Sequence, residues 1–114
     1  WGEKRHYVQQ NRAMEVYKEL EISKVEDQIK EELANAWVKL NESAKRVEIA
    51  QSTLDISREN LMLNTFSYNE GKLPILDVLS SQATWLQAYT SVVSANYQYK
   101  VALAEYVKIL GGYE

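Results

Sequence analysis

The chain contains few of the residues that interrupt helices or cross-link folds. It has 114 residues and no cysteine, which excludes a disulfide framework and a thiolate metal site. It has four glycines and a single proline, Pro74, so long stretches on both sides contain no helix breaker. No run of about 18 apolar residues occurs, so we expect no membrane-spanning helix in this sequence.

Residue patterns for catalysis or nucleic-acid binding are missing as well. The net charge is −3 and no Lys/Arg cluster occurs, which argues against a nucleic-acid partner. The one histidine, His6, lies in a charged segment, and a second histidine that could activate a nucleophile is absent. No glycine-rich phosphate loop is present. We therefore expect no enzyme activity, no cofactor and no metal site.

The start of the sequence suggests a segment of a longer protein. Trp1 stands where an initiator methionine would be, and no signal peptide follows it. We therefore expect an excised or processed piece, with the missing targeting signals saying little about location.

A seven-residue repeat predicts one very long first helix, over about residues 3–69. A row of large residues and a row of small or polar residues alternate in steps of three and four, which is typical of a coiled-coil seam. The large row is Leu33, Leu40, Val47, Leu54, Leu61 and Tyr68. The small row begins with Ile22 and Ile29 and continues with Ala36, Ser43, Ala50, Ser57 and Asn64. Before about Val25 this register weakens, so the first quarter of the helix has different neighbours or none.

A short turn, over about residues 70–73, separates this helix from a second one over about residues 74–110. Gly71 is placed to take a left-handed conformation after the first helix. Pro74 suits the first turn of a new helix, and Asp77 complements the dipole of that turn. We expect the second helix to stop at Gly111 and Gly112.

The second helix is apolar over more than half of its circumference, which is too much for one partner helix. Its large row is Val78, Trp85, Val92, Tyr99 and Tyr106, its small row is Ser81, Ala88, Ala95 and Ala102, and a third row is Leu79, Leu86, Val93 and Val107, interrupted by Lys100. Neighbours from outside the hairpin are needed, so we expect the isolated chain to self-associate.

The two helices together predict an all-α fold: one long antiparallel hairpin, or coiled coil, whose first helix is much longer than its second. If the chain reverses near Lys72, the residue numbers of paired positions add up to about 144. Leu110 then lies opposite residue 34, close to Leu33, where the large row begins. Residues before about 30 extend past the hairpin without a partner.

Several motifs follow one another at spacings that resemble the TolC-like outer-membrane efflux proteins. They are Ala50-Gln51 with Glu59-Asn60-Leu61, Tyr68-Asn69-Glu70-Gly71, Leu76-Asp77-Val78-Leu79 with Gln82-Ala83, Ala95-Asn96-Tyr97-Gln98-Tyr99, and Leu110-Gly111. The opening Trp1-Gly2-Glu3-Lys4-Arg5 resembles the point where that family leaves a barrel strand and enters a long helix. The resemblance rests on the order of these motifs and on the distances between them, which agree along nearly the whole chain.

The resemblance implies a periplasmic hairpin from the second of two repeats in a homotrimeric channel of a Gram-negative outer membrane. Such channels are passive exit ducts of tripartite multidrug efflux pumps or type I secretion systems. They meet a periplasmic adaptor protein and an inner-membrane pump, and they enter the membrane only through a barrel portion that this sequence lacks.

The resemblance also implies roles for residues near the turn. Tyr68 and Asp77 match the channel tip, or gate, and the exposed loop of Gly71, Lys72, Leu73 and Pro74 is the expected adaptor contact. Leu73 and Ser80 stand where the best-known members have a gating arginine and a second aspartate, so the same salt-bridge network is not expected. Pro74 replaces the usual Ser or Thr. The alternative is a free-standing coiled-coil scaffold or an adaptor hairpin without a channel.

Overall fold

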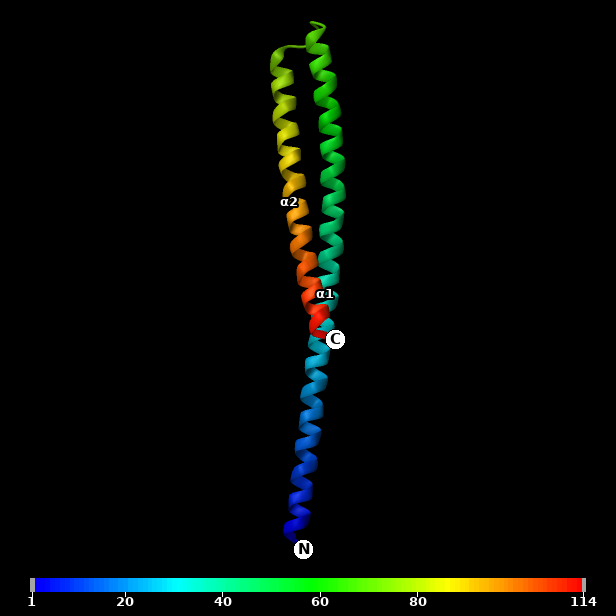
Figure 1. The fold of residues 1–114 in the computed structure, drawn as a ribbon, viewed down its shortest axis with the longest axis vertical. Coiled ribbons are helices and arrows are strands. Elements are labelled where there is room, and N and C mark those ends of the chain that lie inside the picture. Colours follow the sequence, from blue (N-terminus) through cyan, green and yellow to red (C-terminus); the bar gives the residue numbers. More distant parts are fainter. Residues whose placement is uncertain (1, 114) are drawn as a thin grey trace.

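The computed structural model describes residues 2–113 and contains two antiparallel helices, α1 (Gly2–Asn69) and α2 (Ile75–Tyr113). The molecule measures 105 × 18 × 14 Å, with the turn at one end and the free start of α1 at the other (Figure 1). The predicted fold is confirmed: the described chain is a long helical hairpin, and α1 with 68 residues is much longer than α2 with 39.

The seam between the helices consists of the rows that the seven-residue repeat predicts. On α1 the buried residues are Ala36, Ser43, Leu54 and Ser57. On α2 they are Val78, Ser81, Ala88, Val92 and Ala95. Leu54, Ala88 and Val92 form a cluster against which Ala50 and Trp85 pack. Small residues on both helices let the backbones approach closely, and the large row fills the space beside them. Tyr68, the last member of the large row, is 40% exposed, so the half-buried part of that row ends one heptad earlier, at Leu61.

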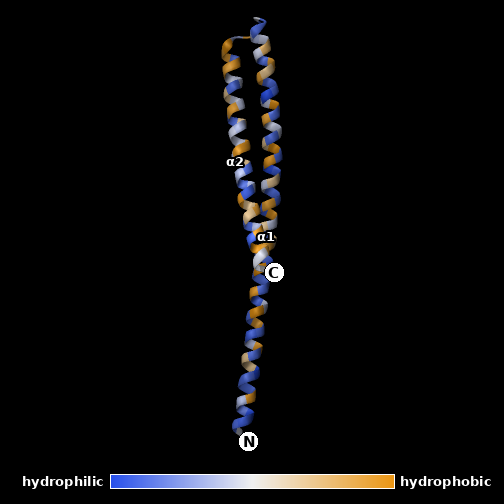
Figure 2. Ribbon diagram, viewed as in Figure 1, coloured by the Kyte–Doolittle hydropathy of each residue, from blue (hydrophilic) through white to orange (hydrophobic). Residues whose placement is uncertain are grey.

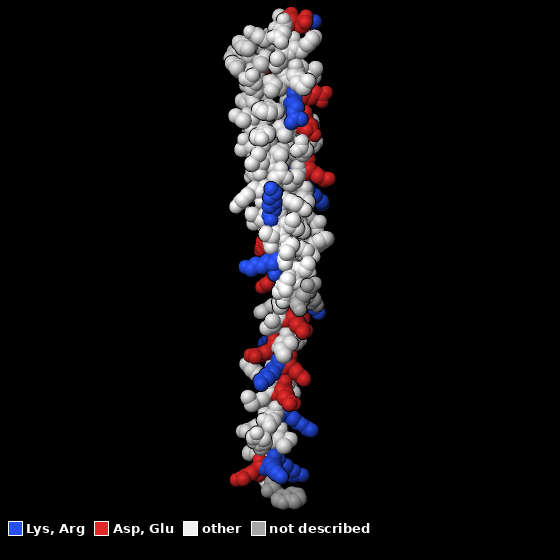
Figure 3. Space-filling view, in the orientation of Figure 1, with Lys and Arg blue, Asp and Glu red and all other residues white. Residues whose placement is uncertain are grey.

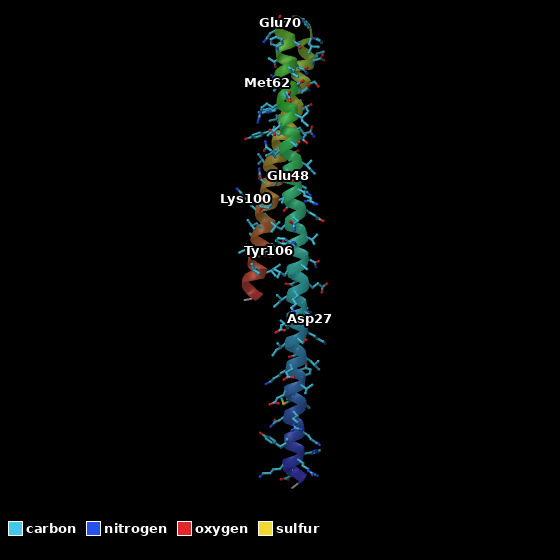
Figure 4. The ribbon with its side chains drawn as sticks, turned by 90° about the vertical axis from the view of Figure 1, so that its right-hand side faces the viewer. Asp27, Glu48, Met62, Glu70, Lys100 and Tyr106 are labelled. Atoms are coloured by element: carbon cyan, nitrogen blue, oxygen red, sulfur yellow. The ribbon has the colours of Figure 1, made fainter. Side chains whose placement is uncertain are left out.

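Two contacts between the helices fix their register. The rings of Trp37 and Tyr106 lie 5.5 Å apart near the open end, and the amide of Asn64 donates a hydrogen bond to Ser81 near the turn. The residue numbers of these pairs add up to 143 and 145, which agrees with the predicted pairing. Tyr106 lies between the two ribbons in Figure 4.

The end of α2 differs from the prediction. The helix does not stop at Gly111 and Gly112 but continues through both to Tyr113. Glycine in a helix costs only about 1 kcal/mol relative to alanine, so two glycines weaken the helix without ending it. Because α2 is longer than predicted, the seam begins four residues before Leu33, at the half-buried Ile29, which lines a hollow together with Ile109 and Gly112.

The first part of α1 has no partner within the described residues. Residues 2–28 are all exposed, and Figure 1 shows them as a single helix beyond the end of α2. This overhang agrees with the prediction that residues before about 30 extend past the hairpin. None of the described helices is both long enough and apolar enough to cross a membrane.

The hairpin leaves much more surface open than a compact protein of its size. Its radius of gyration is 28.5 Å, against about 13 Å for a compact chain of this length. Its accessible surface is 9534 Å², whereas its mass of 13.2 kDa predicts about 6,400 Å². Apolar turns recur along both helices in Figure 2, including positions outside the seam. The excess surface is therefore partly apolar and suited to further helix packing.

Candidate functional site at the hairpin tip

The turn ends α1 with a Schellman motif centred on Gly71. The amide of Gly71 donates to the carbonyl of Tyr68 at 2.9 Å, and the amide of Lys72 donates to the carbonyl of Ser67 at 2.8 Å. Gly71 has φ +75°, the left-handed conformation expected from the sequence. These bonds satisfy carbonyls at the end of α1 and reverse the chain within a few residues.

Pro74 and Asp77 begin the second helix. Pro74 lies immediately before α2 rather than inside its first turn, and its carbonyl accepts a hydrogen bond of 3.1 Å from the amide of Asp77. A difference of one residue is within the usual uncertainty of a helix boundary. Asp77 is the acidic residue of the first turn, where its charge complements the helix dipole.

A short polar network ties the tip to the seam. The side-chain amide of Asn64 donates to the hydroxyl of Ser81, and this hydroxyl donates to the carbonyl of Asp77 at 2.9 Å. Ser81 is 5% exposed and Asn64 is half-buried, so the bond between them is shielded from water. These two hydrogen bonds therefore fix the register between the first turn of α2 and α1.

The predicted gate residues Tyr68 and Asp77 both lie at the tip, one at each side of the turn. Both are exposed, and no hydrogen bond or ion pair joins them among the residues that the structure describes. Both side chains are thus available to neighbours outside the hairpin. The structure does not bring them into a shared polar site within one chain.

The predicted adaptor contact forms the outermost part of the molecule. Gly71, Lys72 and Pro74 are exposed, as is the neighbouring Glu70 at the end of the hairpin in Figure 4. Leu73 is half-buried. The surface that the loop offers is therefore mainly polar backbone with one cation and one carboxylate.

Sequence analysis missed a group of apolar side chains around the loop. We call it the tip cluster: Met62, Phe66, Ile75 and Leu76, with exposed fractions of 66%, 64%, 45% and 71%. The signal that could have revealed the cluster is that none of the four belongs to a seam row, although they lie within about two turns of the loop.

Charges are distributed unevenly between the helices. Residues 78–99 of α2 contain no charged side chain. In Figure 3 the charged side chains of the upper hairpin lie along α1, whereas the α2 side carries almost none. A groove of about 870 Å³ runs between the helices here, lined by Ile49, Ala50 and Thr53 on α1 and by Thr90, Ser91 and Ser94 on α2. Arg46 of α1 also lines this groove, whereas its α2 side is uncharged and suits contact with other helices.

The described residues contain no group of His, Cys, Asp or Glu arranged to hold a metal ion.

Neither the comparison with curated proteins nor that with solved structures gave a match. A protein-family comparison gave a match that covers residues 1–112, almost the entire chain, and its family is described as outer membrane efflux protein. That family is one of transport proteins and not of enzymes. The chain therefore belongs to the outer membrane efflux protein family, in agreement with the resemblance noted from its motifs.

Proposed function

We propose that the chain is the periplasmic tunnel segment of a trimeric outer membrane efflux channel, a passive exit duct of a tripartite multidrug efflux or type I secretion system. The observation that carries this proposal is the agreement between the family match over residues 1–112 and the shape of the hairpin. A rod 105 Å long with unburied apolar rows is suited to side-by-side packing into a tube wall. A soluble scaffold acting alone has no use for so much exposed apolar surface.

In this proposal the turn is the periplasmic tip. Tyr68 and Asp77 line its opening, and three copies of Asp77 form an acidic ring that attracts cations. Gly71, Lys72, Leu73 and Pro74 contact the adaptor protein, with the tip cluster beside them as an apolar flank. Exposure of the loop and of the tip cluster supports this assignment.

Cysteine labelling tests the location of the tip. The natural sequence of this segment has no cysteine, so Lys72→Cys in the intact channel introduces a unique label site here. A maleimide that does not cross the inner membrane should react with Lys72→Cys in cells whose outer membrane has been permeabilised. Reaction only after the inner membrane is also opened would contradict a periplasmic tip. Ser57→Cys, which is 6% exposed, is the matched control and should stay unlabelled.

Cross-linking tests the adaptor contact. A photoreactive group attached to Lys72→Cys should link to the adaptor when the pump is assembled. The same group at Glu48→Cys, far from the tip in Figure 4, should not. Equal cross-linking yields at the two positions, or no cross-link from position 72 in assembled pumps, would contradict an adaptor contact at the loop.

A further inference from the structure

A stripe of polar side chains runs along α2 from its first turn. Its members follow one another in alternating steps of three and four residues, and every one of them is exposed. We call it the polar stripe: Asp77, Ser80, Thr84, Gln87, Ser91, Ser94 and Gln98. The next position in the same rhythm is Val101, so the stripe ends at Gln98. Because this spacing keeps side chains on one face of a helix, the stripe covers a single face over about 30 Å.

The other exposed positions of α2 at this level are mostly apolar. They include Leu79, Leu86, Tyr89, Val93 and Tyr97, with exposed fractions between 48% and 69%. Gln82, Thr90 and Asn96 are single polar residues among them. The apolar positions gain from contact with other helices, whereas the polar stripe does not. We therefore expect the stripe to be the face of α2 that stays in water when helices pack around it.

The charged residues of α1 at the same level point away from the polar stripe. Between residues 47 and 69 they are Glu48, Asp55, Arg58 and Glu59, and we call this group the charged face. None of the four lines the groove that the polar stripe shares with α1. Asp55 follows the groove residue Thr53 by two positions, so it points about 200° away. Arg58 lies 3.7 Å from Asp55 and therefore belongs to the same side.

Arg46 differs from the charged face, because it lies in the groove. Of the twelve described residues that line the groove, it is the one with a charge. Arg46 and Gln98 also line the neighbouring hollow, so Arg46 lies at the height where the polar stripe ends. Its side chain is exposed, and no ion pair holds it among the residues that the structure describes. Charges of both signs follow farther from the tip, where Glu42 and Glu105 line the same hollow.

We propose that the polar stripe lines the passage of the channel and that Arg46 supplies the first charge on this wall beyond Asp77. The inference rests on the proposed function, which places Asp77 at the opening, since the stripe begins at that residue. Three copies of Arg46 would stand about 30 Å from Asp77 along the passage. They would attract anions, whereas the ring of Asp77 attracts cations. The wall is amphipathic, since Ile49 and Leu86 line the groove as well.

Contact with another helix is the alternative use of this groove. Such a helix would remove water from the guanidinium of Arg46, which has no carboxylate partner among the described residues, and a buried charge without a partner is costly. It would also cover the amide of Gln87 and the hydroxyl of Ser91, which then need new hydrogen-bond partners. Water in a passage satisfies all three groups at no such cost. The physical chemistry of the groove therefore favours the passage.

Removal of one charge from each face tests the assignment of Arg46. In the intact channel, Arg46→Gln should raise the cation-to-anion permeability ratio by roughly twofold, because the wall loses a positive charge. This change is opposite in sign to the one expected for Asp77→Asn. Arg58→Gln is the matched control and should leave the ratio unchanged, since Arg58 belongs to the charged face. An unchanged ratio in Arg46→Gln, or a larger change in Arg58→Gln, would overturn the proposal.

Cysteine modification tests the polar stripe itself. Ser91→Cys and Gln51→Cys replace exposed, uncharged residues at similar heights, one in the stripe and one on the side of the charged face, and the segment has no other cysteine. A methanethiosulfonate reagent that carries trimethylammonium adds a positive charge at each. It should lower the cation current through the Ser91→Cys channel by roughly twofold or more, because the charge then stands in the passage. The Gln51→Cys channel should keep its current although mass spectrometry shows the label.

Two results of this labelling would contradict the polar stripe as the wall. One is a fall in current for Gln51→Cys alone, which would assign the passage to the charged face. The other is an unlabelled Ser91→Cys, which would mean that a helix covers the groove. Both measurements start from a channel that conducts ions, so either result would leave the proposed function intact. Failure of the chain to form a conducting channel would contradict the proposed function and this inference together.

Discussion

Trp37 of α1 and Tyr106 of α2 form an aromatic pair that joins the two helices close to the end of α2. Their ring centroids are 5.5 Å apart and the planes are tilted by 50°. Tyr106 is half-buried, whereas Trp37 remains 52% exposed, so the indole contacts α2 through part of its surface. The pair lies about two helical turns before the end of α2, beyond which α1 continues as a single overhanging helix.

Trp37→Ala should destabilise the hairpin by about 1–2 kcal/mol. An aromatic pair contributes about 0.5–1.5 kcal/mol beyond the area that it buries, and part of the indole surface is buried as well. Val38→Ala is the matched control: Val38 is 53% exposed and should change stability by less than about 0.5 kcal/mol. Thermal unfolding followed by circular dichroism measures both. Equal losses of stability in the two variants would mean that the contact of Trp37 with α2 does not stabilise the hairpin.

Leu54→Ala should cost about 2–5 kcal/mol, because Leu54 is 3% exposed at the centre of the seam cluster and its removal leaves a cavity. Leu63→Ala deletes the same atoms from a side chain that is 59% exposed. At concentrations that keep the chain monomeric, this control should stay within about 0.5 kcal/mol of the native protein. Chemical denaturation measures the loss of unfolding free energy in each variant. A larger loss for Leu63→Ala than for Leu54→Ala would contradict the observed orientation of α1.

Gly71→Ala should destabilise the turn by about 1–2 kcal/mol through backbone strain alone. Gly71 has φ +75°, and a methyl group added there would meet nothing within 4 Å. Gly112→Ala is the matched control, since Gly112 lies in α2 with equally open surroundings. It should stabilise the chain by about 0.5–1 kcal/mol, because alanine favours a helix. Melting temperatures that move in the same direction for both variants would contradict the assigned turn.

The bond from Asn64 to Ser81 should show a coupling energy of about 0.5–1.5 kcal/mol in a double-mutant cycle with Asn64→Ala and Ser81→Ala. Ser81→Ala alone leaves a half-buried amide without its partner, so its cost should exceed that of Thr84→Ala, an exposed hydroxyl that bonds within its own helix. A coupling energy of zero would indicate that the bond does not form in solution.

The seam could be predicted from the sequence because it repeats. The same two rows recur over four heptads from Leu33 to Leu61, so an error at one position does not change the register. Pairing between the helices followed from the turn, since Gly71 and Pro74 fix the point of reversal. Antiparallel helices joined by a short turn then have only one alignment.

Features that depend on small energy differences could not be predicted. The helix passes through Gly111 and Gly112, since a cost of about 1 kcal/mol for each glycine is too small to end a helix by itself. Asn64 could be placed in the small row, but its bond to Ser81 requires the register to within one residue. The tip cluster escaped notice because Phe66 and Leu76 follow no repeat.

Asp77 provides the test of the channel tip itself. If three copies surround the opening, Asp77→Asn in the intact channel should lower the cation-to-anion permeability ratio by roughly two- to fivefold, because the ring loses its negative charge. Glu70→Gln removes one charge per chain from the other side of the same loop and serves as the control, for which a smaller change is expected. Reversal potentials under a salt gradient in planar bilayers measure both ratios. An unchanged ratio in Asp77→Asn, with only a loss of about 0.3–1 kcal/mol in helix stability, would reduce Asp77 to a residue that complements the dipole of α2.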